Sequence, residues 1–268
     1  PLMFSEANLS FVEALFESVS GITTTGGTVL TGKYVTEMDE MAVIRLDSGY
    51  NIGASKEKIE RVAHAPSQPP EGAGVVVQDP DLPEIAIIST GGTIASRIDY
   101  RTGGVTSQFE ANEILRMIPE LRGVARYRDR QTTNILSENM RPANWQVLAR
   151  TIYEEIQEGA EGVIVTHGTD TMAHSAAAIR FMVKTPVPIV FVGSQRSADR
   201  PSSDAAMNLL CSAAVATGDL GEVAVVMHAT TSDDRCAIHR ATRVRKMHTS
   251  RRDAFKSMGT APLGYVDY

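Results

Sequence analysis

The chain has 268 residues, of which 43% are hydrophobic, so its length and composition allow a real core in one large domain or in two ordinary ones. Its 26 basic and 32 acidic residues give a formal net charge of −6, which excludes a general electrostatic attraction to nucleic acid. The two cysteines, Cys211 and Cys236, are too few for a disulfide framework and favour a reducing, cytoplasmic environment. We expect neither a membrane span nor a signal peptide, because no apolar run has the length or the flanks that either requires.

Residues 1–27 differ in character from the rest of the chain. Residues 9–19 carry apolar side chains at helical spacing, and a threonine-rich turn follows at residues 21–26. The segment resembles the pore helix and filter loop of Trk/Ktr-type potassium transporters, in which backbone carbonyls replace the water shell of a cation. A filter needs several such loops around one axis, so no channel follows from this one. We interpret residues 1–27 as a leader, and a fused reading frame would explain it.

A small β domain is predicted at residues 28–65. Short strands at residues 32–35, 41–46 and 51–54 are separated by polar turns, which indicates a small β-barrel or meander. The glycines around residue 30 have the spacing of a phosphate-binding loop, but Tyr34 stands where Ser or Thr should bind magnesium, so we exclude that function. Residues 66–83 contain five prolines and are predicted to form a linker between domains.

From residue 84 onwards, predicted strands and helices alternate. This alternation is typical of an α/β fold with a doubly wound, mostly parallel sheet. Right-handed crossovers between such strands bring their carboxyl ends to one edge of the sheet. The strands are predicted at residues 84–88, 132–136, 162–166, 187–192 and 222–227, and the helices at residues 109–118, 142–158, 171–183 and 204–217.

The first of these strands ends on the sequence Thr90-Gly91-Gly92-Thr93. Two glycines allow a tight turn and a close approach of a ligand to the backbone. The two threonine hydroxyls then stand at the carboxyl end of a strand, where open α/β sheets bind their ligands. The alternative is an ordinary glycine turn whose threonines cap the next element. Taken alone, the stretch leaves both alternatives open.

Three later segments carry further polar side chains. Ser137 and Glu138 follow a predicted strand, and the sequence His-Gly-Thr-Asp-Thr at residues 167–171 joins a strand to a helix, where Thr169 or Asp170 would also serve as a helix N-cap. The last of the three is the basic run at residues 235–256, which includes Lys246. Such a run is often a solvated face, or it contacts phosphate, tRNA or a partner subunit. The histidines show no spacing typical of metal ligands.

In their order and spacing, the segments at residues 90–93, 137–140 and 167–172, followed by Lys246, resemble the L-asparaginase family. Longer strings also resemble the D-subunit family of the archaeal glutamyl-tRNA(Gln) amidotransferases; they lie at residues 48–53, 89–99, 135–140, 193–204 and 244–258. Ordinary asparaginases lack the small β domain in front. The resemblance therefore favours a tRNA-dependent enzyme over a free L-asparaginase.

The resemblance implies an amidohydrolase that releases ammonia from glutamine or asparagine, which is then used to convert Glu-tRNA(Gln) to Gln-tRNA(Gln). It implies that Thr93 is the nucleophile, with Tyr100 on a lid as its hydrogen-bond partner. It also implies that Thr169, Asp170 and Lys246 form a second triad. A lysine acts as a base there only if burial and neighbouring cations lower its pKa. The nearby arginines that we expect to supply such charge are Arg243, Arg245, Arg251 and Arg252.

The substrate-binding residues implied by the resemblance are Ser137, Glu138, Gly92 and Gly168. The first two match residues that hold the carboxylate and ammonium groups of the amino acid, and Asp170 is expected to hold the ammonium as well. Glu138 stands where ordinary asparaginases have Gln, so the detailed contacts of this position are open.

The resemblance also implies the partners of the chain. We expect the E-subunit of the amidotransferase as the partner, ATP and magnesium on that partner, tRNA bound mainly through it, and a homodimer through the asparaginase fold. No metal or cofactor is expected in this subunit. The chain ends about where the first asparaginase domain ends, so we expect the second domain to be missing. The alternatives are a free L-asparaginase and a catalytically incomplete fragment.

Overall fold

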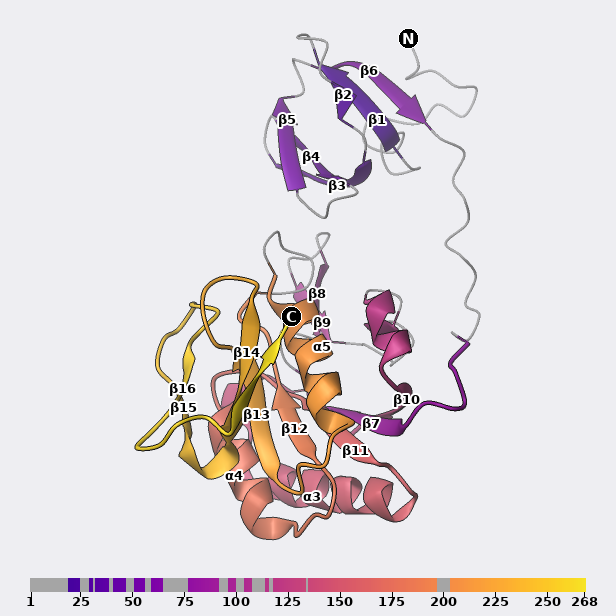
Figure 1. Cartoon of the computed structure of the whole chain (residues 1–268). Helices are drawn as coiled ribbons and strands as arrows, with labels where there is room; N and C mark the ends of the chain where they lie inside the picture. Colours follow the sequence, from indigo (N-terminus) through magenta and orange to yellow (C-terminus); the bar gives the residue numbers. More distant parts are fainter. Residues whose placement is uncertain are drawn as a thin grey trace. The chain divides into compact units, whose positions relative to one another are not determined.

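The structure is a computed structural model (Figure 1). It describes residues 19–24, 29–30, 32–38, 41–46, 51–55, 59–64, 77–91, 96–99, 104–107, 114–115, 118–133, 135–196 and 203–268. The chain divides into two compact units. The strands up to residue 64 belong to a β unit, and the large sheet with its helices belongs to an α/β unit.

The β unit contains two antiparallel three-stranded sheets. In the first sheet the order is β2-β1-β6, and in the second it is β3-β4-β5. The strands are β1 (Val19–Thr24), β2 (Val29–Leu30), β3 (Gly32–Met38), β4 (Met41–Leu46), β5 (Asn51–Ser55) and β6 (Ile59–His64). The three strands predicted from the sequence correspond to β3, β4 and β5.

Strand β1 corrects the interpretation of residues 1–27 as a separate leader. Ile22 pairs with Leu30 of β2 and with Val62 of β6, so β1 is the central strand of its sheet. The run from Val19 to Thr24 is rich in β-branched residues, which favour a strand over a filter loop. The rest of the expected amphipathic helix, residues 9–18, lies outside the described residues.

The α/β unit is built on a seven-stranded sheet with the order β10-β7-β11-β12-β13-β14-β17 (Figure 1). The first five of these strands run parallel, and β14 and β17 are added antiparallel. This confirms the predicted mostly parallel, doubly wound sheet. The strands are β7 (Glu84–Ser89), β10 (Arg126–Gln131), β11 (Gly162–Thr166), β12 (Ile189–Val192), β13 (Val223–His228), β14 (Arg235–Arg240) and β17 (Gly264–Asp267).

Helices pack on both faces of this sheet (Figure 1). Successive side chains of β7 point to opposite faces: Ile87 joins the core cluster that contains Leu209 of α5, whereas Ile88 joins the cluster that contains Ile152 of α3 and Ile179 of α4. Both faces are therefore covered, which explains why the parallel strands are nearly continuous apolar runs. The helices are α3 (Pro142–Gln157), α4 (Met172–Met182) and α5 (Ala205–Ala216).

Edge strand β10 replaces the strand that the sequence predicted at residues 132–136. Four of the six residues of this segment (Arg126–Gln131) are charged, so it lacks the apolar run that is typical of a buried strand. Arg128 forms ion pairs with Glu84 of β7, at 2.9 Å, and with the buried Glu155 of α3, also at 2.9 Å. These partners compensate for the arginines at the sheet edge, and only the folded chain shows them.

The remaining elements are short. β8 (Ser96–Asp99) and β9 (Gly104–Ser107) form a two-stranded sheet, as do β15 (Val244–Lys246) and β16 (Phe255–Ser257). The 3₁₀ helices are η3 (Pro119–Gly123), η4 (Ser137–Asn139) and η5 (Ala241–Arg243). Of the helix predicted at residues 109–118, Ile114 and Leu115 are helical and buried, and most of the rest lies outside the described residues. None of the helices in the described ranges combines the length and apolar character that a bilayer crossing requires.

Candidate active site

Three polar side chains meet where strand β11 ends and the β15–β16 ribbon passes. The Nζ atom of Lys246 donates hydrogen bonds to Oγ1 of Thr169, at 2.8 Å, and to Oδ1 of Asp170, at 2.9 Å. Thr169 is 7% exposed and the Lys246 side chain 13%, whereas the Asp170 side chain is 67% exposed. The cluster thus has a shielded hydroxyl and amine, with a carboxylate that faces solvent.

The turn between β11 and α4 positions Thr169 and Asp170 and also packs against Ser137. A Cβ atom on Gly168 would lie 2.6 Å from the Cβ atom of Ser137, so no larger residue fits without a shift of the backbone. The hydroxyl of Thr171 donates to the backbone carbonyl of Ser137 at 2.7 Å. Ser137 is buried at 4% exposure, and Glu138 beside it is exposed. The structure therefore brings Ser137 and Gly168 together next to the Thr169 turn.

The end of strand β7 is tied to the same edge of the sheet. The backbone amide and the hydroxyl of Thr90 both donate to the carbonyl of Thr166, at 3.2 and 3.0 Å, and the Thr90 carbonyl accepts from the amide of Ile135. Gly91 has a φ of +104°, and a Cβ atom there would lie 2.6 Å from the Ile135 carbonyl oxygen. Glycine is therefore required at this position.

Three of the residues that the sequence singled out lie outside the described residues: Gly92, Thr93 and Tyr100. Their roles stay predictions. Of the other six, five form two contacting groups, with Ser137 beside Gly168 and Lys246 beside Thr169 and Asp170. The sixth, Glu138, follows Ser137 directly in the chain, but its side chain is exposed.

A buried histidine lies beneath the turn. His167 is fully buried, and desolvation lowers its pKa to about 4 although its Nδ1 atom lies 2.7 Å from the carbonyl of Gly168. The ring is therefore neutral at pH 7, and Nδ1 carries the proton because a carbonyl only accepts. The neutral imidazole fixes the Gly168 carbonyl without adding a charge next to the Lys246 cluster.

Sequence reasoning missed Gln195, which follows strand β12. The hydroxyl of Thr169 donates to Oε1 of Gln195 at 2.9 Å. Asp204, which was expected only to cap α5, makes no side-chain cap bond to that helix. Both of its carboxylate oxygens instead accept from the backbone N–H of Gln195 at 3.0 Å, and Oδ1 also accepts from the backbone N–H of Arg196 at 2.9 Å. The position of Gln195 at the end of β12, beside β11, was the signal that sequence analysis had available.

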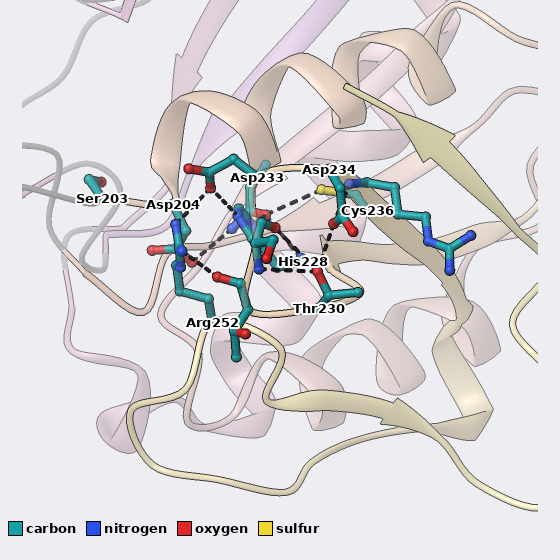
Figure 2. Close-up of polar contacts among 12 residues, drawn as sticks. Ser203, Asp204, His228, Thr230, Asp233, Asp234, Cys236 and Arg252 are labelled. Carbon is teal, nitrogen blue, oxygen red and sulfur yellow. Dashed lines mark hydrogen bonds and ion pairs between the residues drawn. The ribbon is translucent and has the colours of Figure 1, made fainter.

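A hydrogen-bond network continues from the buried Asp204 through His228 to the exposed Asp233 (Figure 2). The side-chain amide of Asn208 donates to Asp204 at 3.0 Å, and its oxygen accepts from Nδ1 of His228 at 2.6 Å. The other ring nitrogen of His228 lies 3.1 Å from Asp233, which also pairs with Arg252 at 2.6 Å. The network links the loop that carries Gln195 to the segment between β15 and β16.

The basic run at residues 235–256 is largely paired within the chain. Arg251 and Lys256 flank Asp253, and the hydrogen bond from Arg251, followed by that from Lys256, lowers the pKa of Asp253 to about 2. Arg240 pairs with Glu222, and the guanidinium of Arg235 lies over the ring of Tyr265. These contacts leave less free positive charge for a phosphate backbone than the sequence alone indicates.

Of the arginines expected beside Lys246, Arg245 does not share its face of strand β15. Arg243 and Arg245 are exposed. Neighbouring residues of a strand point to opposite faces, so the side chains of Arg245 and Lys246 diverge. The charged group in contact with the Lys246 amine is the carboxylate of Asp170.

The α/β unit matches a known protein family. The family model described as Asparaginase, N-terminal matches residues 84–268, and the chain belongs to the asparaginase family. Among solved structures, it is similar to a probable cytoplasmic L-asparaginase from Campylobacter jejuni, with a TM-score of 0.61 and 33% identity over 69% of this chain and 56% of that one. The thermostable L-asparaginase from Thermococcus kodakarensis gives a TM-score of 0.60 with 29% identity, over 68% and 53% of the two chains.

Similarity is higher to one branch of relatives. The chain is 57% identical over 256 residues to the D-subunit of the glutamyl-tRNA(Gln) amidotransferase of Methanosarcina mazei, which covers 90% of this chain and 60% of that protein. The D-subunit proteins of Halobacterium salinarum and Archaeoglobus fulgidus are 58% and 54% identical, over 86% and 90% of this chain and 56% and 57% of their own lengths. The chain thus spans less than two thirds of the length of these curated relatives.

Proposed function

We propose that this chain is the ammonia-releasing part of a tRNA-dependent amidotransferase, and that it hydrolyses the side-chain amide of glutamine or asparagine. The observation that carries the proposal is the contact of Lys246 with both Thr169 and Asp170 at the carboxyl end of β11. The similarity to the amidotransferase D-subunit proteins covers 90% of the chain, and therefore includes most of the β unit as well as the asparaginase part. This coverage favours the tRNA-dependent enzyme over a free L-asparaginase.

In the proposed reaction Thr93 is the nucleophile and Tyr100 is its hydrogen-bond partner. The Thr93 oxygen bonds to the amide carbon of the substrate, the C–N bond breaks, and the nitrogen takes up a proton and leaves as ammonia. Water then hydrolyses the resulting ester, which restores the Thr93 hydroxyl and releases the acidic amino acid. The pair of Lys246 and Thr169 moves the proton, and the neighbouring Asp170 holds the ammonium group of the substrate.

The proposed substrate site continues along the same edge of the sheet. Ser137 and Gly168, which are in contact, would line the amino-acid end of the substrate together with Gly92 and Glu138. The exposed carboxylate of Asp170 is available to a cationic group from solvent. A negative charge at this place suits the ammonium group that glutamine and asparagine share.

We propose that the ammonia passes to the E-subunit of the amidotransferase, which would carry ATP, magnesium and most of the tRNA contacts, and that the asparaginase fold forms a homodimer. The D-subunit relatives are named as parts of such an amidotransferase. Cys211 and Cys236 are free thiols, which supports a reducing, cytoplasmic setting.

The test is ammonia release by the protein as its gene encodes it, purified with its partner subunit and assayed with glutamine and with asparagine. Thr169→Val and Lys246→Ala should each lower turnover by a factor of at least about 100, the range in which a proton-transfer group contributes. Release that persists near the wild-type rate in both variants would overturn the proposal. Full asparagine turnover without the partner would favour the free L-asparaginase, and no turnover with either amide would favour the catalytically incomplete fragment.

A further inference from the structure

We propose that Gln195 is a positioning residue that sets the direction of the Thr169 hydroxyl proton, so that the Thr169 oxygen faces Lys246 as an acceptor. This inference rests on the proposed function and concerns the same site. No residue of the second triad predicted from the sequence performs this task.

The protons of Lys246 and Thr169 determine which atom donates in their contact. A threonine hydroxyl has one proton and two lone pairs, and a lysine ammonium only donates. Since Lys246 donates to Thr169 at 2.8 Å, the Thr169 proton must point elsewhere. Oγ1 of Thr169 lies 2.9 Å from Oε1 of Gln195, which accepts that proton. Gln195 therefore determines which side of the Thr169 oxygen is free for the amine.

The orientation of the Gln195 amide follows from its other contacts. Its Nε2 atom lies 2.9 Å from the backbone carbonyl oxygen of Arg251 and 3.4 Å from the carbonyls of His248 and Thr249. Carbonyl oxygens only accept, so the nitrogen must face them and the oxygen must face Thr169. The flipped amide would place its nitrogen towards Thr169 and its oxygen against three other oxygens.

The backbone of Gln195 is fixed as firmly as its side chain. Both carboxylate oxygens of Asp204, which is fully buried, accept from the backbone N–H of Gln195 at 3.0 Å. Asn208 donates to the same carboxylate at 3.0 Å, and it also donates to the Gly193 carbonyl on the same loop. A buried carboxylate with several donors is a rigid anchor. Gln195 is thus held from both ends while it contacts Thr169.

These contacts allow a second role for Gln195, which is to anchor the segment between β15 and β16. The segment follows Lys246 directly, so loss of the contact between Gln195 and the Arg251 carbonyl would also disturb the site. The two roles use different atoms: the oxygen of Gln195 serves Thr169, and the nitrogen serves the Arg251 carbonyl. Substitutions that remove the two atoms separately distinguish the roles.

The experiment compares Gln195→Met with Gln195→Glu in the protein as its gene encodes it, purified with its partner subunit. Methionine keeps the length but removes both the acceptor and the donor. Glutamate keeps an acceptor towards Thr169 and loses the donor towards Arg251. Gln157→Met at the exposed end of α3 is the matched control. The readouts are kcat and KM for ammonia release from pH 5 to pH 10, with thermal unfolding as a check of the fold.

We expect Gln195→Met to lower kcat by about 10- to 100-fold, as a small misplacement of a reacting group does, with KM within about twofold of the wild type. Gln195→Glu should recover most of this loss at alkaline pH. The acidic limb of the pH profile of kcat should move to higher pH in this variant. The added carboxylate favours the protonated amine of Lys246, which then loses its proton only at higher pH. Gln157→Met should match the wild type in both constants.

The proposal is overturned if Gln195→Glu loses as much activity as Gln195→Met at every pH, because anchoring of the segment would then explain both. It is also overturned if Gln195→Met lowers the unfolding temperature but leaves kcat unchanged. Thr169→Val and Lys246→Ala, assayed in parallel, separate this inference from the proposed function. If these two variants lose turnover and the Gln195 variants keep it, only the inference about Gln195 is wrong. If all four keep it, the proposed function is wrong.

Discussion

The amine of Lys246 lies 2.8 Å from the hydroxyl of Thr169, although 77 positions separate the two residues in the chain. Strand β15 delivers the lysine from outside the main sheet, and the turn after β11 delivers the threonine. Two separate elements of the fold therefore position the two side chains in contact. Local structure does not bring a lysine and a hydroxyl together at such a distance in sequence. We therefore assign this contact a role in the proposed reaction.

The first prediction concerns the two ends of the proposed proton path. In the complex with the partner subunit, Thr93→Ala and Lys246→Ala should each abolish glutamine-dependent formation of Gln-tRNA(Gln), because neither variant can release ammonia. Free ammonium should still support the reaction, and this serves as the internal control. Near-wild-type glutaminase turnover in Thr93→Ala would show that the nucleophile is another residue.

The second prediction concerns Gly168. Gly168→Ala should lower turnover by about 10-fold or more, because the new Cβ atom would lie 2.6 Å from that of Ser137 and must move the turn that carries Thr169. Gly123→Ala is the matched control, since no atom lies within 4 Å of a Cβ at that position. Equal turnover of the two variants would mean that the turn adjusts without cost. The measurement is kcat for ammonia release.

The third prediction concerns the buried carboxylate of Asp204. Asp204→Ala should lower the free energy of unfolding by about 2–4 kcal/mol, because the amides of Gln195 and Arg196 lose a charged acceptor in a buried site. Asp219→Ala, at an exposed position, should change it by less than about 0.5 kcal/mol. Urea unfolding followed by circular dichroism measures both. A loss for Asp204→Ala no larger than that of the control would contradict the assigned anchor.

The fourth prediction is a loss of stability at acid pH that depends on His239. Burial lowers the pKa of His239 to about 4, whereas an unfolded histidine titrates near pH 6.5. The stabilisation from the neutral ring is therefore fully present above about pH 6.5 and is lost as the pH falls towards 4. This stabilisation amounts to no more than about 3.5 kcal/mol, given about 1.4 kcal/mol for each unit of pKa difference.

The check is urea unfolding at pH 7.5 and at pH 4.5. His239→Gln should lose less stability between these two pH values than the wild type does, because glutamine takes up no proton. His174→Gln, on the exposed side of α4, should follow the wild type. An identical loss in all three proteins would show that other groups cause the acid sensitivity.

The central strands could be predicted from the sequence because they are buried on both faces. Strand β11 has the bounds expected for it, residues 162–166, and all five of its residues are buried. Strand β14, by contrast, lies within the basic run and was not predicted. Its interior residues Cys236 and Ala237 are buried, while the arginines at its two ends are exposed. A window dominated by charge at its ends conceals a strand of this kind.

The candidate site could be predicted only in part. Resemblance to a family, rather than local pattern, identified Lys246, since a lysine in a basic run usually faces solvent. Gln195 was missed because its signal in the sequence was only its place after strand β12, and the residue type glutamine indicates no role there. Its importance depends on the direction of a single proton on Thr169, and only the contacts of both atoms of its amide reveal that direction.

Strand β1 has a practical consequence for anyone who trims the protein. Val19–Thr24 pairs with β2 on one side and with β6 on the other. A start codon placed at residue 28, after the apparent leader, would remove this central strand and leave two unpaired backbone edges. Such edges recruit strands from other molecules. We expect a shortened protein of this kind to precipitate or to form intermolecular sheets, because β6 would lose the strand with which it pairs.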